Sequence, residues 1–432
     1  MISHAGGSIA DVTPAERDVR VWWNLAAAAL LIRFVIMPYG GFPVDIGTFK
    51  AWANSLAERG PAAFYGAGFA DYLPGYLYVL WVIGEVHKVV RFNDPAFLFA
   101  LKLPSALADV ATAWIIFTMG RRFGAPQALA LSASYLFNPG IIFNGAFWGQ
   151  ADAVGALIVL AGIALLDVAS PVVVAILLAA GSLIKPQSAP AVIPAALYLI
   201  RTLSRPPSGP PRWDLLMGAG LGALATVVMI ILPFGLSPIR LLGVLRTSLG
   251  VYPYSSVVAF NFWGATQGFW QSDGVRWFGV PLYALGAAAT LVAIAAIAVW
   301  SWRHPTVRCV VLASAASVLV TFVLPTRIHE RYLLTAIPFF AIASAIDRRM
   351  IVVYAGLTLV FTTNLVFAYT RPYVQTFSVP GWLEATLYSV VGTRTLSALG
   401  VAVLVVALVL LFRSATRQAA PVETAVRATT GD

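Results

Sequence analysis

Apolar runs of helical length recur along almost the whole chain, separated by short polar breaks. A transmembrane helix needs about 20 predominantly apolar residues. Every backbone polar group inside a bilayer must be hydrogen-bonded within the protein, so only helices and closed barrels can span it, and runs of this length favour helices. The apolar segments are 21–38, 73–91, 96–119, 126–143, 151–168, 171–184, 188–200, 213–233, 277–300, 306–324, 332–346, 350–370 and 395–412.

The composition also indicates a membrane protein. Hydrophobic residues make up 59% of the 432 residues and charged residues only 11%, whereas a soluble domain carries roughly 25% charged residues. The formal charge of +10 comes mostly from Lys and Arg in short loops, which is the topology bias of membrane proteins, so we expect no nucleic-acid partner. The predicted fold is all-α: one polytopic transmembrane bundle over 20–413, with cytoplasmic tails at 1–19 and 414–432.

Basic loops set the predicted orientation, because Lys and Arg concentrate on the cytoplasmic side. They occur at Arg121-Arg122, in 201–212, at 303–308, at Arg348-Arg349 and after the last apolar segment. The remaining loops would then be extracytoplasmic: 39–72, 144–150, the region near 185–187, 234–276, 325–331 and 371–394.

Two features complicate this topology. If 21–38 crosses outward, 73–91 and 96–119 cannot both cross, so we expect one of them to be re-entrant or to stay on one side, leaving about twelve spans. Segments 171–184 and 188–200 are short for full spans. We predict a broken pair that meets at Lys185-Pro186-Gln187.

The first extracytoplasmic loop, 39–72, contains a predicted amphipathic helix. Ile46, Phe49, Trp52, Ala53 and Leu56 recur at spacings of three and four, which places them on one face of a helix that would lie on the membrane surface. Asp45 immediately precedes this helix. It is either a helix N-cap or a functional carboxylate.

Other polar side chains gather in the same predicted outer region. They are candidates for binding a substrate, because ionisable groups at membrane boundaries are costly and usually functional. The candidates are Asp71 and Tyr72, Trp148, Gln150 and Asp152, Lys185 and Gln187, and the cluster Arg327, His329, Glu330 and Arg331.

Lys185 interrupts an apolar run, where a cation costs at least ~2.5–3.5 kcal/mol. One reading is a structural ion pair, with Asp152 as the partner, or a side chain that reaches the interface. The other reading is a counter-ion for a lipid phosphate, since Pro186 breaks the helix and frees backbone groups to line a cavity.

Arg327 and Arg331 are spaced by one helical turn and could face one anion, because guanidinium groups match phosphate oxygens. An ordinary basic loop is the alternative, although basic residues are not expected on the outer side. The outer aromatic residues, among them Trp270 and Trp382, are either interface anchors or sugar contacts.

Four of these features, in chain order, resemble the GT-C superfamily of polyprenyl-phosphate-dependent glycosyltransferases. The order is similar to that of the dolichyl-phosphate-glucose glucosyltransferases and GPI mannosyltransferase I, and it looks closest to their bacterial relatives. The features are the acid before the amphipathic helix (Asp45 to Trp52), Asp71-Tyr72-Leu73-Pro74, Lys185-Pro186-Gln187 and His329-Glu330-Arg331.

The resemblance implies an inverting transfer of one hexose, of mannose or glucose type, from a polyprenyl-phosphate donor to a glycan or lipid-linked acceptor. It implies that Asp45 is the general base, that Lys185 and Arg331 contact phosphate, and that His329 and Glu330 bind or orient the donor. Several family members carry two consecutive acids in the first loop. Here Ile46 follows Asp45, which argues against a metal-dependent variant. The implied location is a bacterial inner membrane with an outward-facing site.

Several classes of site are absent from the sequence. There is no metal-binding His or Cys pattern and no phosphate-binding glycine motif, which disfavours a transition-metal site, a nucleotide-driven pump and a nucleotide-sugar enzyme. We expect no cofactor. The main alternative is a secondary transporter or flippase for a lipid-linked or anionic substrate, which also places ionisable groups in broken helices. A non-enzymatic assembly factor is the third reading.

Overall fold

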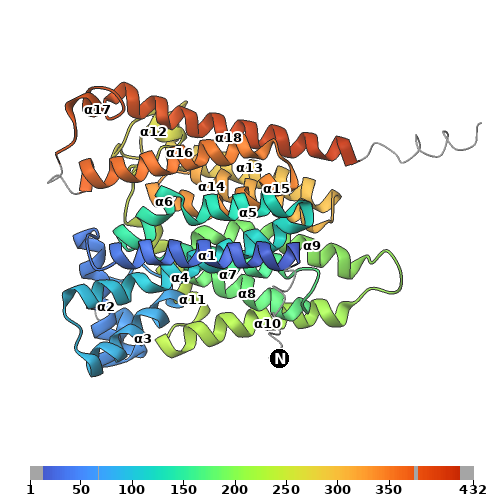
Figure 1. Ribbon diagram of the computed structural model, residues 1–432, viewed down its shortest axis with the longest axis horizontal. Helices are drawn as coiled ribbons and strands as arrows, with labels where there is room; N and C mark the ends of the chain where they lie inside the picture. The colour runs from blue at the N-terminus through green and yellow to red at the C-terminus, as the bar shows by residue number, and fades with distance from the viewer. Residues whose placement is uncertain (1–12, 67, 374–377, 419–432) are drawn as a thin grey trace, which may run out of the picture.

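The computed structural model describes residues 13–66, 68–373 and 378–418. Across these ranges the chain is helical apart from one small hairpin, β1 (Arg276–Trp277) paired with β2 (Val280–Pro281), and an isolated bridge between Tyr254 and Ser272. The all-α prediction is therefore confirmed. Most helices run side by side along the horizontal direction of Figure 1.

The α-helices of the first half are α1 (Pro14–Ile36), α2 (Pro43–Arg59), α3 (Pro74–Val90), α4 (Asp94–Gly120), α5 (Ala125–Leu136), α6 (Pro139–Ile142), α7 (Asp152–Ala164), α8 (Pro171–Ile184) and α9 (Val192–Ser204). Those of the second half are α10 (Trp213–Ile231), α11 (Pro238–Gly250), α12 (Phe262–Thr266), α13 (Leu282–Arg303), α14 (Val307–Val323), α15 (Ala336–Ile346), α16 (Met350–Ala368), α17 (Gly381–Ala385) and α18 (Val390–Gln418). Short 3₁₀ or π segments join them: η1 (Pro61–Gly66), η2 (Arg121–Phe123), η3 (Phe143–Trp148), η4 (Pro186–Ala191), η5 (Leu232–Phe234), η6 (Glu330–Thr335) and η7 (Tyr369–Tyr373).

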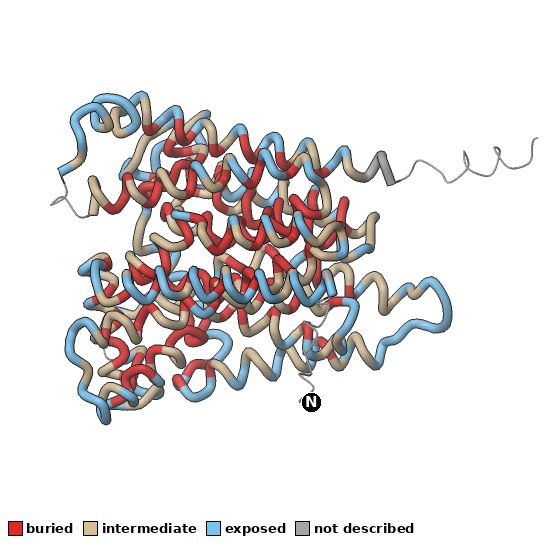
Figure 2. The backbone as a smooth tube through the Cα atoms, in the orientation of Figure 1, coloured by how far each residue is buried: buried red, intermediate tan, exposed pale blue. Residues whose placement is uncertain are grey.

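Six helices in the described part of the chain are long and apolar enough to cross a membrane: α1, α4, α10, α13, α16 and α18. Much of this apolar surface is not covered by protein, as the pale blue segments of Figure 2 show. On α10, Met217, Leu221 and Met229 are exposed. An apolar helix that exposes such side chains is typical of contact with lipid.

Helices α2 and α3 lie together at one end of the bundle, at the left of Figure 1, and we call this the α2–α3 end. The loop between α9 and α10, with its basic residues, projects at the opposite end. Helix α3 packs along α2: Lys88 Nζ donates to Ala57 O over 2.6 Å, and Gly84 contacts the backbone of Ala53.

This pairing identifies which of the two conflicting segments fails to qualify as a span. Helix α4 has 27 residues, which correspond to about 40 Å, and it is apolar enough to cross. Helix α3 has 17 residues and contains Glu85 and Lys88, and it is not among the candidate spans. By length and composition, 96–119 thus qualifies as a span and 73–91 does not.

The amphipathic helix of the first loop is present, but two of its expected properties are wrong. Its apolar face is buried against α3 and its surroundings, in one cluster with Tyr76 and Leu80, so this face packs on protein and is not available to lipid. Helix α2 begins at Pro43, with Phe42 before it and no side-chain cap. Asp45 is therefore inside the first turn and is not an N-cap.

The broken pair is confirmed. Ser170 caps α8, and the helix ends at Ile184. Lys185 is extended, with φ −143° and ψ 111°, and Pro186 begins η4. Because proline cannot donate to the preceding turn, the helix stops there.

The helical domain extends past the predicted boundaries at 20 and 413. Thr13 and Glu16 form a capping box, which starts α1 within the expected tail, and α18 continues to Gln418. The rest of both tails, 1–12 and 419–432, lies outside the described residues.

Candidate functional site

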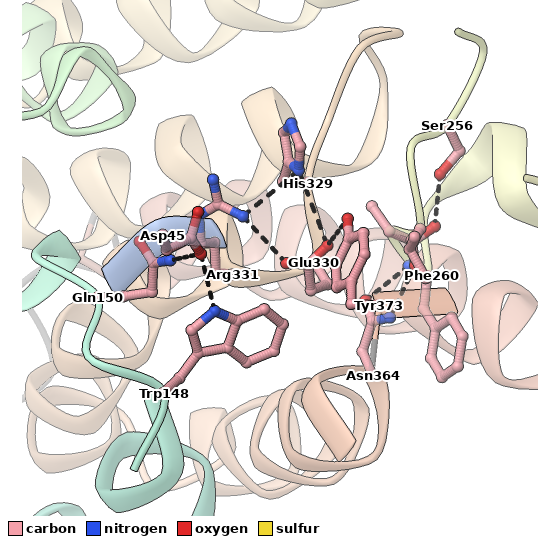
Figure 3. Close-up of polar contacts among 12 residues, drawn as sticks. Asp45, Trp148, Gln150, Ser256, Phe260, His329, Glu330, Arg331, Asn364 and Tyr373 are labelled. Carbon is pink, nitrogen blue, oxygen red and sulfur yellow. Dashed lines mark hydrogen bonds and ion pairs between the residues drawn. The ribbon is translucent and has the colours of Figure 1, made fainter. Parts of the chain in front are cut away.

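Asp45 is held by two side chains from η3 and the turn that follows it. Its Oδ2 accepts a hydrogen bond from Trp148 Nε1 over 2.9 Å and a second, shorter one from Gln150 Nε2. Both bonds are drawn in Figure 3. Among the described residues no donor reaches Oδ1. The carboxylate is thus fixed through one oxygen while the other remains available to a ligand.

The turn before α2 is also held by hydrogen bonds to distant parts of the chain. Phe42 N donates to Trp148 O over 3.4 Å, and Tyr369 Oη donates to Gly41 O over 3.0 Å. Gly40 has φ +66°, and a Cβ there would lie 2.5 Å from the ring of Phe147. Only glycine permits this close packing of the turn against η3.

Buried polar side chains of α4 bond both the turn before α2 and the turn after η3. Ser105 Oγ donates to Gln150 O over 2.6 Å, and Lys102 Nζ donates to Tyr39 O over 2.6 Å. The stem of Lys102 also lies against Gly149, which has φ +93°. These contacts connect Asp45 and its donors to a long, well-packed helix. Sequence reasoning missed them, because each is a single polar residue in an apolar run.

A cavity of about 410 Å³ is lined in part by Arg331, whose side chain lies beside Asp45 in Figure 3. Its volume is within the range of about 300–1,000 Å³ that is typical of ligand sites. Its walls come from α11, α13, α14, η4 and the segments that flank α3 and η6. One part is apolar, with Leu245, Val318 and Phe322. The other part carries most of the predicted site residues: Asp71, Tyr72, Lys185, Gln187, Arg327, His329 and Arg331.

Lys185 lies on the cavity wall and has two protein partners. Its Nζ donates to Tyr72 Oη over 2.7 Å and lies 3.5 Å from Asp152 Oδ1. The ion pair with Asp152 is therefore real. Because an ammonium group has three donors, Lys185 can still bind an anion in the cavity.

Arg331 lies between Asp45 and Glu330 in Figure 3. Its Nη1 contacts Glu330 Oε1 over 3.2 Å, and Glu330 Oε2 accepts from Tyr373 Oη over 3.2 Å. Burial opposes the charged form of the guanidinium, but the attraction of Asp45 and Glu330 raises the pKa of Arg331. The buried Nε of Arg331 has no partner in the described part of the chain.

His329 lines the cavity. Burial lowers its pKa well below the ordinary value, and Arg331 and Lys185 add to that shift, so the imidazole is neutral. Its Nδ1 lies 3.4 Å from Arg331 Nη1 and 3.9 Å from Glu330 Oε2. Its Nε2 is buried and finds no partner among the described residues.

Arg327 has a different environment from Arg331. Its Nε donates to Asp273 Oδ2 over 2.6 Å, and its Nη1 donates to Leu249 O over 2.9 Å. Arg327 has φ +65°, and the chain from 324 to 329 is not helical. The expected one-turn spacing of the two arginines is therefore wrong, although both side chains line the cavity.

Asp71 also faces the cavity. Burial raises its pKa, against the attraction of Lys185 and Arg331, and repulsion from Asp45 raises it further. The remaining predicted residues, Asp45, Trp148, Gln150, Asp152 and Glu330, do not line the cavity. They lie behind it as hydrogen-bond or ion-pair partners.

Two tyrosines were not predicted from the sequence. Tyr373 reaches Glu330, and Tyr252 lies edge-on against His329, with ring centroids 4.7 Å apart. Their only sequence signal is an aromatic residue in a predicted outer loop, which many interface anchors share.

A second buried ion pair, also not predicted, lies away from the cavity. Arg33 of α1 contacts Asp109 of α4 over 3.1 Å, and both are almost fully buried. Arg33 also donates to Leu136 O over 2.9 Å, and Tyr135 Oη donates to Asp109 over 3.5 Å. None of these residues lines the cavity.

No group of three His, Cys, Asp or Glu side chains in the described ranges could hold a metal ion. A comparison with models of known protein families finds no match, and a comparison with curated proteins finds none either.

Proposed function

We propose that the protein is an inverting, polyprenyl-phosphate-dependent hexosyltransferase of GT-C type. The observation that supports this most directly is the cavity: its polar part carries Lys185, His329 and Arg331 beside the Asp45 carboxylate, and its other part is apolar. Such a cavity suits an anionic headgroup with a hydrocarbon tail.

Each step of the transfer has a residue that fits it. Asp45 takes the proton from an acceptor hydroxyl, and that oxygen attacks the anomeric carbon. The bond from the anomeric carbon to the phosphate oxygen breaks, and its electron pair stays on the lipid phosphate. Lys185, Arg331 and the imidazole of His329 stabilise that charge, as preorganised polar groups do in other sites. A positioned base typically contributes ~10²–10⁴-fold.

The proposed setting is a bacterial inner membrane, with about twelve spans and the α2–α3 end facing the periplasm or exterior. The basic loop between α9 and α10 supports this orientation, because it lies at the opposite end of the bundle. The donor tail would enter the apolar part of the cavity from the bilayer, and the acceptor would be a glycan or a lipid-linked sugar.

The test is to incubate the purified, membrane-reconstituted protein with a panel of polyprenyl-phosphate sugars that differ only in the hexose. We expect one donor to be consumed and polyprenyl phosphate to be released. A flippase would move the lipid across a vesicle without cleaving it, so recovery of every donor intact would reject the transferase proposal.

A further inference from the structure

Trp270 occupies an unusual position beside the candidate site. It is a non-glycine residue with φ +59°, and a bulky residue in the left-handed region costs of order 1–3 kcal/mol. Its indole is nonetheless 39% exposed. A strained backbone that presents a large aromatic ring to solvent calls for an explanation other than core packing.

The surrounding backbone holds Trp270 in this conformation. Trp270 N donates to Ser256 O over 2.9 Å, and Ser255 N donates to Gln271 O over 2.7 Å. The paired segment is joined to the cavity wall, because Arg327 N donates to Tyr254 O over 2.9 Å and Val257 N donates to Ile328 O over 3.2 Å. Trp270 is thus fixed relative to His329 and Arg331.

The indole belongs to a row of rings that leads to Asp45. Trp270 lies edge-on to Tyr254 and to Tyr373, with centroids 5.1 Å and 6.3 Å apart. Tyr373 in turn packs against Phe42, at 5.1 Å, and against Trp148, at 5.9 Å. Trp148 is the residue that donates to Asp45. We call Tyr254, Trp270, Tyr373 and Phe42 the aromatic shelf.

We propose that the aromatic shelf binds the acceptor as a pyranose ring. The faces of aromatic rings are negative, so they attract the C–H groups on the face of a sugar. The shelf reaches Asp45 through Phe42 and through Trp148, which packs against Tyr373 and donates to Asp45. None of the shelf residues is part of the cavity wall, so the acceptor and the donor would have separate binding surfaces. This assignment rests on the proposed transferase function, whose acceptor it defines as a sugar-bearing one.

The experiment measures binding of methyl α-D-mannopyranoside and methyl α-D-glucopyranoside to the protein in nanodiscs by saturation-transfer NMR. We expect at least one to bind, and Trp270→Ala to weaken that binding by roughly fivefold to tenfold. Alanine is also disfavoured at φ +59°, so the change removes the ring without relieving the strain. Trp382→Ala is the matched control, because Trp382 is exposed by 66% in α17 and is not in the shelf. Trp270→Phe should retain most of the binding.

Two results would overturn the shelf: no binding of either pyranoside by the wild-type protein, or equal binding by Trp270→Ala. The donor-consumption assay and the pyranoside-binding assay together distinguish failure of the shelf proposal from failure of the proposed function. Donor consumption in the panel assay with unchanged pyranoside binding by Trp270→Ala would reject only the shelf. Pyranoside binding lost on Trp270→Ala, with every donor left intact, would reject the transferase and leave the shelf as a sugar-binding surface without an acceptor role.

Discussion

Two clusters of buried charged residues, one around Arg33 and one around Lys185, differ in their surroundings. Arg33, Asp109 and Tyr135 form a closed cluster: Arg33 bonds Asp109 and two carbonyl groups, only its Nη2 lacks a partner among the described residues, and none of the three residues lines the cavity. Lys185, His329 and Arg331 belong to an open cluster, whose members also line a cavity and leave His329 Nε2 and Arg331 Nε without partners among the described residues.

Burying charges is costly in both places, but the compensation differs. In the closed cluster it comes from the fold itself, so the cluster serves stability. In the open cluster the charged side chains line a cavity, so a ligand there could complete their hydrogen bonds. The proposed function depends on this difference, and the following experiments test it.

The largest expected effect is on turnover. Asp45→Asn should reduce transfer by at least about 10²-fold, because the amide cannot accept the acceptor proton, while the melting temperature stays close to that of the wild type. Asp109→Asn is the matched control in the closed cluster and should show the reverse, with a lower melting temperature and activity per folded molecule retained. Wild-type turnover by Asp45→Asn would reject Asp45 as the base.

Breaking the closed cluster should affect folding. We expect Arg33→Met to lower the free energy of unfolding by about 3–5 kcal/mol, because Asp109 is then a buried, unpaired charge. Arg33→Met combined with Asp109→Leu should recover most of that loss. Both are measured by denaturant titration in micelles. A loss of donor affinity in folded Arg33→Met protein would contradict the separation of the two clusters.

Removing one cation of the open cluster should mainly weaken lipid binding. For Lys185→Ala and Arg331→Ala we expect the dissociation constant of polyprenyl phosphate to rise roughly 10-fold to 100-fold, as hydrogen bonds to charged groups contribute about 1.5–3 kcal/mol. Arg327→Ala should have a smaller effect, because Asp273 already occupies that guanidinium. Unchanged affinity in both Lys185→Ala and Arg331→Ala would remove the phosphate site.

The smallest expected effect is a pH dependence of stability. The pKa of His329 is lowered in the folded protein, so unfolding takes up a proton below the ordinary histidine value of about 6.5. The free energy of unfolding should therefore fall as the pH drops through that value, by up to about 1.4 kcal/mol per pH unit. His329→Gln should flatten the slope between pH 6.5 and 5.5, and His304→Gln is the control. An unchanged slope in His329→Gln would mean that His329 is not held neutral.

The pattern of the sequence predicted the helical class, the broken pair at Lys185 and the apolar face of α2, because apolar periodicity and proline act locally, but it placed that face on the membrane surface and not against α3. It could not decide between 73–91 and 96–119, since that depends on α3 packing along α2. Asp45 illustrates the same limit. Its position suggested an N-cap, and only its contacts with Trp148 and Gln150, more than a hundred residues away, show another environment.

The contact between Tyr369 and Gly41 joins residues 328 positions apart, which has a consequence for biosynthesis. A membrane protein is made from its N-terminus, and contacts of such separation form late. The segment with Asp45 emerges before Arg331 and Tyr373, which follow almost 300 residues or more later. A truncated or stalled chain would therefore carry the carboxylate without the groups around it, so activity would report complete assembly.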